Sequence, residues 1–362
     1  MRHLLLWLHR WTGIVLATYV VIIGLSGATL VFHDDIARQV RVPHVTSSTA
    51  PALSADAIAN RVRHAFPDWQ FQTLFWPEDS TSPWFAEVRQ GQVGAVGETA
   101  LAVYLHPQTG EVMRTHNYSR STWRWLQLLH FNMLSGRNGR VVNGVLALVT
   151  LFSILTGICA WWPAGRARPL VRINPRASTP RMMWESHQVV GLYTTIFMIV
   201  ASLTGSYFAW RGQVHQAIAA LFPMRFMNQP VRPIDPPPQG GALPIERFLP
   251  AIAALIPDYP VTRVIFPERP DAPIRFIVYE GSRAQFYKAS NLFFHPTTGA
   301  LLRADLVRDR LAGDSIVQWI GAVHYGAFGS WPVKLLWLLG GMLFPVIAIT
   351  GVVIWINKRN KT

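Results

Sequence analysis

Four long stretches of the chain contain no charged residue and consist mostly of apolar side chains: residues 11–32, 141–165, 186–210 and 335–357. A helix needs about 20 apolar residues to cross the hydrocarbon core of a bilayer. Each stretch meets that length, so the pattern predicts four transmembrane helices. The first stretch is longer than the apolar core of a signal peptide and has three companions, which favours an uncleaved anchor.

The segments between these stretches have the mixed pattern of folded domains. In each, a helical spacing of apolar residues comes first, and runs rich in aromatic and β-branched residues follow. The predicted helices are 54–66 and 245–256, and the predicted strands are 70–76, 84–89, 100–106, 261–266, 274–279 and 285–294. The sequences HPQTG and HPTTG are turn signals between two strands, so a further strand should follow each turn.

The second half of the chain repeats the first. His9 matches His187, His130 matches His324, and LHPQTGEV matches FHPTTGAL. Each unit consists of a span, an outside domain and a second span, so the chain returns to its starting side and the two copies are parallel. The expected fold is a membrane α-helical protein, with a four-transmembrane-helix bundle from two parallel repeats and two periplasmic α+β domains.

The net charge of +14 is concentrated on one side of the predicted spans. Basic residues are frequent at the N-terminus, in the segment 166–183 and in the C-terminal tail, whereas basic and acidic residues balance in 34–139. This positive-inside pattern predicts cytoplasmic termini and periplasmic domains in a bacterial inner membrane. The basic composition is therefore assigned to contact with the lipid bilayer, and nucleic acid is excluded as a partner.

These boundaries divide the chain into consecutive segments. They are 1–33 (cytoplasmic start and first span), 34–140 (first domain), 141–165 (second span), 166–185 (basic linker), 186–210 (third span), 211–334 (second domain) and 335–362 (last span and tail). The single cysteine, Cys159, lies in the second span, so the domains must be stable without an intramolecular disulfide.

Histidines at the ends of the spans are the candidate functional groups. Ion-coupled transporters usually keep an ionisable residue inside the bundle, and the four uncharged stretches contain no acidic or basic residue. His9 and His187 occupy equivalent cytoplasmic-side positions, and amphipathic segments at 120–134 and 314–327 carry His130 and His324 at the outer side. Haem needs two axial imidazoles that face each other, so the symmetry predicts two such pairs.

Glycines occur where a flat macrocycle would need room between helices. Gly27 and Gly205 lie 18 residues beyond His9 and His187, which is about 27 Å along a helix and matches the depth of the outer pair. The glycines expected to line the two sites are Gly13, Gly191, Gly27, Gly205, Gly157 and Gly351. Small residues also serve ordinary helix packing, but the symmetric set favours ligation.

Other cofactor signals are weak or missing. His33 is a weaker ligand candidate, because its repeat mate is Arg211. The run GQVGAVG lies between strands without a following helix, so it is not a dinucleotide loop. The sequence has no C-x-x-C-H motif for covalent haem and no flavin or nicotinamide motif, so electrons must come from another molecule.

The sequence resembles the PepSY-associated transmembrane family over nearly its whole length. The resemblance is carried by LHRWTGIVLATYVVIIGLSGATLVFHDDI, LLHFNMLSGRNGRVVNGVLALVTLFSILTGICAWWP, HQVVGLYTTIFMIVASLTG and HYGAFGSWPVKLLWLLGGMLFPVIAITGVVIW. Members include iron-regulated inner-membrane proteins and di-haem ferric-siderophore reductases. The resemblance implies two haems b per chain, held at the matching His9, His130, His187 and His324, and PepSY-like folds for the outside domains.

Three functions remain open from the sequence. The first is a di-haem b reductase that passes electrons outward to a periplasmic acceptor, with a ferric siderophore as the expected acceptor. The second keeps both haems but uses a quinone or another small oxidant. The third is a non-enzymatic PepSY module that binds a partner or regulates a protease. The electron donor, a quinol or a cytoplasmic reductase, and the catalytic residues are not identified by the sequence.

The second domain is expected to attract the acceptor more than the first. Segment 211–334 carries an excess of positive charge, and Arg263, Arg275, Arg283 and Lys288 lie among its strands. The expected acceptor site lies between the two domains, above the outer histidine pair.

Overall fold

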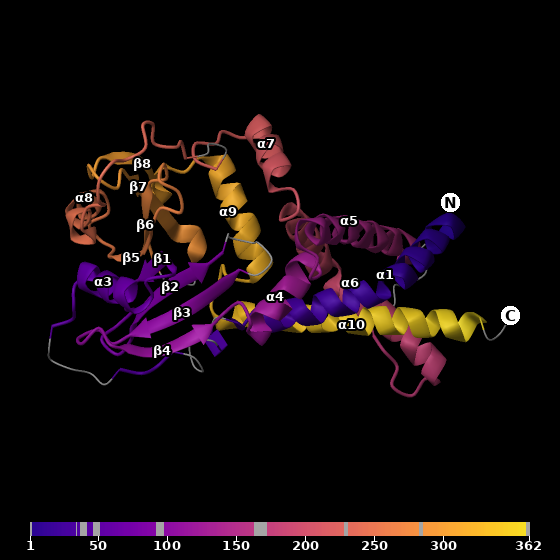
Figure 1. Cartoon of the computed structure of the whole chain (residues 1–362). Helices are drawn as coiled ribbons and strands as arrows, with labels where there is room; N and C mark the ends of the chain where they lie inside the picture. Colours follow the sequence, from indigo (N-terminus) through magenta and orange to yellow (C-terminus); the bar gives the residue numbers. More distant parts are fainter. Residues whose placement is uncertain are drawn as a thin grey trace. The chain divides into compact units, whose positions relative to one another are not determined.

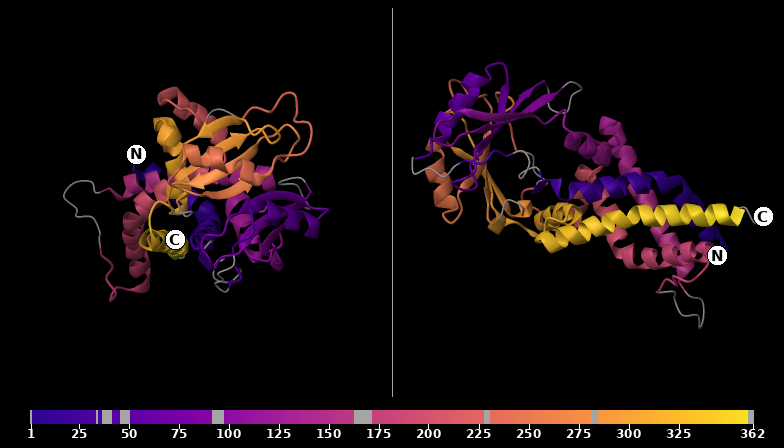
Figure 2. Two further views of the ribbon diagram at one scale, coloured as in Figure 1. Left: turned by 90° about the vertical axis from the view of Figure 1, so that its left-hand side faces the viewer. Right: turned by 90° about the horizontal axis from the view of Figure 1, so that it is seen from below.

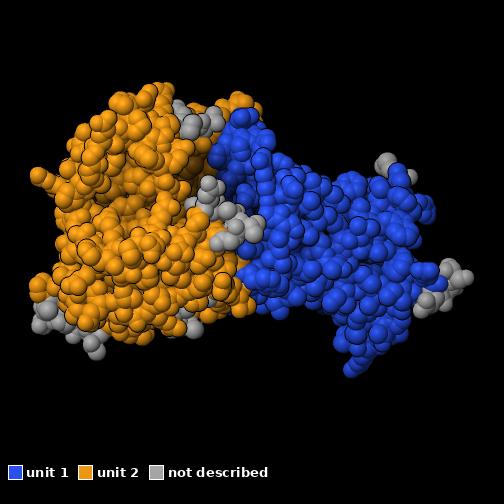
Figure 3. Space-filling view, in the orientation of Figure 1, with its two compact units in different colours: residues 1–33, 125–217, 319–362 blue, residues 34–124, 218–318 orange. Residues whose placement is uncertain are grey.

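The structure is a computed structural model that describes residues 2–33, 35–36, 42–45, 51–91, 98–162, 172–227, 231–281 and 285–359. Most of the GQVGAVG run, part of the basic linker and Arg283 lie outside the described residues. The chain divides into two compact units, coloured separately in Figure 3. The first comprises 1–33, 125–217 and 319–362, and the second comprises 34–124 and 218–318.

The first unit contains four long apolar helices. They are α1 (Arg2–Leu30), α5 (Gly136–Trp161), α6 (Thr179–Tyr207) and α10 (Trp331–Arg359). All four are long and apolar enough to cross a membrane, as the charge-free stretches predict. α1, α5 and α6 begin at least five residues before the apolar stretches, because charge-bearing residues such as Arg and Glu are good helix formers and need not end a helix.

These four helices form a closed ring of contacts. α1 packs against α5 and α10, and α6 packs against the same two helices, so the helices lie side by side in Figures 1 and 2. Small residues allow a close approach between α1 and α10, since a Cβ atom on Gly24 would lie only 2.5 Å from Cβ of Phe344. Glycine at such a crossing is typical of helix packing in a bilayer.

Two shorter helices, α4 (Thr122–Asn132) and α9 (Ala312–Tyr325), carry His130 and His324. Each is separated from the next long helix by a turn with positive φ, which is 51° at Met133 and 64° at Gly326. The outer histidines therefore precede the spans. The two segments of the second unit end at Arg124 and Gln318, whereas the predicted domain boundaries are at residues 140 and 334. A further helix, α7 (Arg211–Leu221), has no sequence prediction.

The second unit contains one antiparallel sheet of eight strands in the order β4-β3-β2-β1-β5-β6-β7-β8. The strands are β1 (Gln70–Phe75), β2 (Trp84–Gln90), β3 (Thr99–Leu105), β4 (Val112–Asn117), β5 (Val261–Ile265), β6 (Ile274–Tyr279), β7 (Ala289–Phe294) and β8 (Leu301–Asp305). β1 and β5 pair with each other, with Leu74 opposite Val264. The two predicted domains are thus joined edge to edge, which removes one exposed edge from each four-stranded sheet.

Most predicted strands are present, with two differences. The segment expected as a strand over 285–294 begins with a 3₁₀ turn, η2 (Phe286–Lys288), and only 289–294 pair in the sheet. The edge strands β4 and β8 follow the HPQTG and HPTTG turns as expected, but their bounds were not predicted. In β4 most side chains are exposed, so the alternating pattern that marks a half-buried strand is missing.

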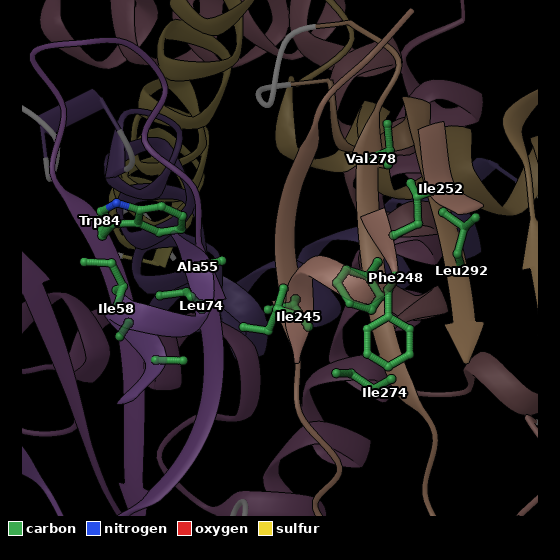
Figure 4. Close-up of a cluster of buried hydrophobic side chains, with 14 of the residues drawn as sticks. Ala55, Ile58, Leu74, Trp84, Ile245, Phe248, Ile252, Ile274, Val278 and Leu292 are labelled. Atoms are coloured by element: carbon green, nitrogen blue, oxygen red, sulfur yellow. The ribbon is translucent and has the colours of Figure 1, made fainter. Parts of the chain in front are cut away.

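Helices cover one face of the sheet. α3 (Ala55–Ala65), η1 (Ile245–Arg247) and α8 (Leu249–Leu255) contribute side chains to a continuous apolar core, part of which is drawn in Figure 4. The two repeats also cap each other, because Asp56 accepts the backbone N–H of Ile245 while Glu246 accepts that of Asp56. These bonds satisfy donors that a helix start leaves without intrahelical partners.

Asp314 anchors the segment Arg225–Met227, which precedes the strands of the second repeat. Its side chain is fully buried and accepts backbone N–H groups from Arg225, Phe226, Met227 and Leu311 at 2.9–3.1 Å. Burial raises the pKa of the Asp314 carboxyl, whereas the four backbone hydrogen bonds lower it. Together the four bonds outweigh burial, so the pKa lies below its ordinary value. The ionised carboxylate is therefore the form that stabilises the fold.

Replacing Asp314 by asparagine should destabilise the second unit by about 2–3 kcal/mol at neutral pH, because hydrogen bonds to a charged acceptor are lost. The extra free energy of unfolding of the wild type should be fully present above the pKa of Asp314 in the unfolded chain, about 3.9. It should decrease as the pH falls through the lower pKa of Asp314 in the folded protein. Thermal unfolding and limited proteolysis in detergent, at pH 7 and at lower pH, measure this. The exposed Asp258→Asn is the control. Equal stability of D314N and wild type at pH 7 would contradict the assignment.

Candidate functional site

The four histidines singled out from the sequence lie as two facing pairs in the first unit. The first pair is His9 on α1 and His187 on α6, with ring centroids 6.1 Å apart. The second pair is His130 on α4 and His324 on α9, with ring centroids 6.2 Å apart. Each pair takes one member from each half of the chain.

The spacing within each pair fits one metal atom between two imidazoles. A nitrogen–metal bond is about 2 Å long, and the ring centre lies about 1 Å farther, so two rings on opposite sides of a metal have centroids about 6 Å apart. Rings in van der Waals contact could be closer. Both pairs thus leave the separation that axial ligation requires.

Hydrogen bonds determine the tautomer of the first pair. Nδ1 of His9 lies 2.9 Å from the carbonyl oxygen of Ser153, and Nδ1 of His187 lies 3.0 Å from that of Ile347. A carbonyl oxygen can only accept, so each Nδ1 must carry the proton and donate it. Nδ1 of His187 also lies 3.1 Å from Oγ1 of Thr350. In both rings, Nε2 is left with the lone pair that binds a metal.

Hydroxyl groups have the same effect on the second pair. Nδ1 of His130 lies 3.0 Å from Oγ of Ser26, and Nδ1 of His324 lies 3.0 Å from Oγ1 of Thr204. Both hydroxyl hydrogens already point at helix carbonyls, those of Ile22 and Val200, at 2.6 Å. The hydroxyl oxygens therefore accept from the imidazoles, which again assigns the proton to Nδ1 and leaves Nε2 available.

Glycines stand next to all four rings, each on a helix that does not carry the histidine. A Cβ atom would lie 2.8 Å from Cε1 of His9 if added to Gly157, and 2.8 Å from Cε1 of His130 if added to Gly27. The corresponding distances are 3.2 Å from Gly351 to His187 and 3.4 Å from Gly205 to His324. A side chain at Gly157 or Gly27 would displace the ring, so these positions make room for the imidazoles themselves.

Two further glycines and one histidine have different surroundings. A Cβ atom on Gly13 or Gly191 would meet nothing within 4 Å, so there is open space one helical turn after His9 and His187. His33 lies beyond the last residue of α1, Leu30, and both histidine pairs are complete without it. Its ligand role stays a prediction.

Among the described residues, no group of three or more His, Cys, Asp or Glu side chains is arranged to hold a metal ion. The candidate ligands are instead two pairs of histidines, with the ring centroids 6.1 and 6.2 Å apart within each pair. A bare ion held by protein alone usually needs four or more ligands, whereas haem supplies four nitrogens of its own and needs only two axial ones. The residues present therefore fit haem and fit a protein-only metal site poorly.

The hydroxyl and carbonyl groups that orient the imidazoles were missed by sequence reasoning. Ser26, Thr204 and Thr350 each come directly before one of the predicted glycines, and the sequence treats them only as small residues. The recurrence of Ser-Gly or Thr-Gly at the depth of each histidine is the signal that could have identified them. The Ser153 and Ile347 contacts use the backbone, so side-chain identity gives no signal for them.

The chain matches the description "PepSY-associated TM region" over residues 6–358, which is nearly its full length. The chain belongs to the PepSY-associated transmembrane family. A comparison with curated proteins finds no match. Membership in this family agrees with the four helices that are long and apolar enough to cross a membrane and with the antiparallel sheet.

Proposed function

We propose that this protein is a di-haem b reductase of the bacterial inner membrane that reduces a periplasmic acceptor, with ferric siderophore as the substrate. The observation that carries the proposal is the shared tautomer of four paired histidines. All four rings have Nδ1 at 2.9–3.0 Å from an acceptor on another helix, so each donates Nδ1–H and keeps the lone pair on Nε2. Metal-ligating histidines usually have this outer hydrogen bond, because it sets the ring orientation.

His9 and His187 would hold one haem, and His130 and His324 would hold the other. Bound haem supplies one-electron transfer at its iron. The protein's own contribution is to orient the four rings and to keep their Nδ1 protons in place. Apolar side chains of α1, α6 and α10 form a buried cluster that includes Leu16, Met198 and Phe344.

The order of the two pairs along α1 supports electron transfer across a membrane. His9 is near the start of α1, and Gly27, which adjoins His130, is near its end. The 18 residues between them correspond to about 27 Å of helix, close to the thickness of a hydrocarbon core. The positive-inside pattern assigns the first pair to the cytoplasmic side, where a quinol or a cytoplasmic reductase would donate electrons.

Loss of one histidine should remove one haem and spare the other. His9→Ala or His187→Ala should reduce the haem content from two per chain to one, because the histidines of the remaining pair lie on α4 and α9 and make their own hydrogen bonds. His130→Ala or His324→Ala should do the same for the second pair. Pyridine haemochrome assays and redox titration measure the content and identify the remaining centre. Acid–acetone should extract all haem from the wild type. A monodisperse variant that lost both haems would argue against two independent sites.

The hydroxyl of Thr204 should matter through its hydrogen bond to His324. Thr204→Val keeps the shape and removes the acceptor, so haem affinity at the second pair should fall about 10- to 100-fold. Thr195→Val is the matched control on the same helix, because the Thr195 hydroxyl donates to the carbonyl of Gly191 and, within the described residues, to no histidine. Haem titration of the apoprotein gives both affinities. Equal loss in the two variants would show that the effect is general helix damage.

The acceptor can be identified by the rate at which it reoxidises the protein. Chemically reduced protein in detergent, mixed with ferric siderophores in a stopped-flow instrument, should be reoxidised rapidly and with a dependence on salt concentration. If quinones reoxidise it quickly and ferric siderophores do not, the quinone alternative replaces the siderophore proposal. If purified protein contains no haem at all, the binding or protease-regulating alternative is favoured.

A further inference from the structure

The sheet face opposite α3 and α8 carries a row of aromatic rings that ends at an arginine. Tyr104, Phe85, Phe75 and Arg263 stand opposite one another on β3, β2, β1 and β5. The rings of Tyr104 and Phe85 stack with centroids 5.3 Å apart, and those of Phe85 and Phe75 stack at 4.8 Å. The Arg263 guanidinium carbon lies 5.4 Å from the Phe75 centroid. The row crosses the seam between the two repeats.

Arg263 has an incomplete set of partners. It makes cation–π contacts with Phe75 and Tyr279, but its Nε atom is buried without a hydrogen-bond acceptor in the part of the chain that the structure describes. The nearby acid, Glu87, is a weak counter-ion, because burial raises its pKa although Arg89 and Arg263 lower it. A buried donor without an acceptor is costly, so this position calls for an explanation.

A second arginine adds to the positive charge. Arg275 on β6 donates Nε and Nη2 to the neutral Asn291 side chain, at 3.0 and 2.6 Å. Burial lowers the pKa of Arg275 and the neighbouring Arg263 lowers it further, whereas Asp305 and Tyr279 raise it by less. The two cations are therefore close enough to repel each other. Two other arginines on this sheet are neutralised, Arg89 by Glu98 and Arg303 by Asp305. Among the described residues, neither Arg263 nor Arg275 forms an ion pair within 4.0 Å, although Glu87 and Asp305 interact with them at longer range.

Packing alone explains this arrangement poorly. Two like charges side by side on a half-buried apolar surface destabilise a fold, and apolar residues of similar size would pack there at lower cost. Stacking on Phe75 and Tyr279 offsets part of the cost but provides no acceptor for the guanidinium N–H groups. Charged residues whose pKa values are shifted by burial and by a like charge are frequent at functional sites. Here the charges are positive, so an anionic ligand would relieve the repulsion.

We propose that this face, from Phe85 across Phe75 to Arg263 and Arg275, binds an anionic metal chelate of the tris-catecholate class. The aromatic row stacks against the catechol rings, and the two guanidinium groups donate to the negatively charged ring oxygens. Planar guanidinium is suited to both interactions, because it stacks on rings and donates hydrogen bonds in its own plane. The inference rests on the proposed function in that the bound chelate would be the electron acceptor, and it narrows that acceptor to an anionic, aromatic class.

The test is equilibrium binding by the full-length protein in detergent, measured by isothermal titration calorimetry. The probe is a Ga(III) tris-catecholate, which has the charge and shape of the ferric chelate but cannot be reduced. Arg263→Gln and Arg275→Gln should each weaken binding at least tenfold, and added salt should weaken wild-type binding. Arg247→Gln, an exposed arginine in the helical layer, should bind like the wild type. Phe85→Leu keeps an apolar side chain without the ring and should weaken binding independently of charge.

A neutral Ga(III) tris-hydroxamate is the comparison ligand and should bind at least tenfold more weakly than the tris-catecholate. Thermal unfolding of each variant verifies that it is folded. Equal binding of the two chelates, or unchanged binding in both arginine variants, would overturn the proposal. Because no electron is transferred, the result is separate from the reductase assays. Haem-free protein that binds the tris-catecholate through these arginines would refute the reductase and support the site.

Discussion

The proposed activity depends on one kind of hydrogen bond, in which an imidazole Nδ1–H is held by an acceptor on a neighbouring element. In an apolar interior, an imidazole N–H without an acceptor is energetically costly. Each ring is therefore oriented with Nδ1 next to a carbonyl or a hydroxyl oxygen. Since that contact also fixes the tautomer, the opposite nitrogen, Nε2, keeps its lone pair. Ring orientation, protonation and the availability of a metal ligand thus have a single physical cause in all four histidines.

The repeat explains why the site is complete only when both halves are present. Each pair takes one histidine from each copy, and each histidine is held by an element of its own copy: α5 holds His9, and α10 holds His187. In the second unit the same duplication joins two four-stranded sheets through β1 and β5. Neither half would bury its shared sheet edge alone, and neither would have a facing imidazole, so the duplication produces the sheet seam and the histidine pairs together.

The sequence predicted the parts of this arrangement that depend on single-residue chemistry. Runs without charge located α1, α5, α6 and α10, because charge is excluded from a hydrocarbon core whatever the tertiary structure. The pairing of His9 with His187 followed from their equivalent positions. The joined sheet did not follow, because each half has its own complete strand pattern and nothing in the pattern of β1 or β5 marks a partner. The sequence separated the amphipathic segment 120–134 from the span 141–165, but it did not indicate the positive φ angles at Met133 and Leu134, residues that ordinarily continue a helix.

The Ser-Gly and Thr-Gly pairs show how two small residues satisfy several requirements at one depth. In Thr204, the hydroxyl donates to the carbonyl one turn earlier, so it stays satisfied without water, and its oxygen remains free to accept from His324. The glycine that follows leaves the space the ring occupies. Thr156 departs from this scheme, because its hydroxyl donates to the carbonyls of Phe152 and Ser153 and the Ser153 carbonyl itself accepts from His9. What all four histidines share is therefore a hydrogen-bond acceptor on the adjoining helix, close to the glycine. A backbone carbonyl or a side-chain hydroxyl can provide it.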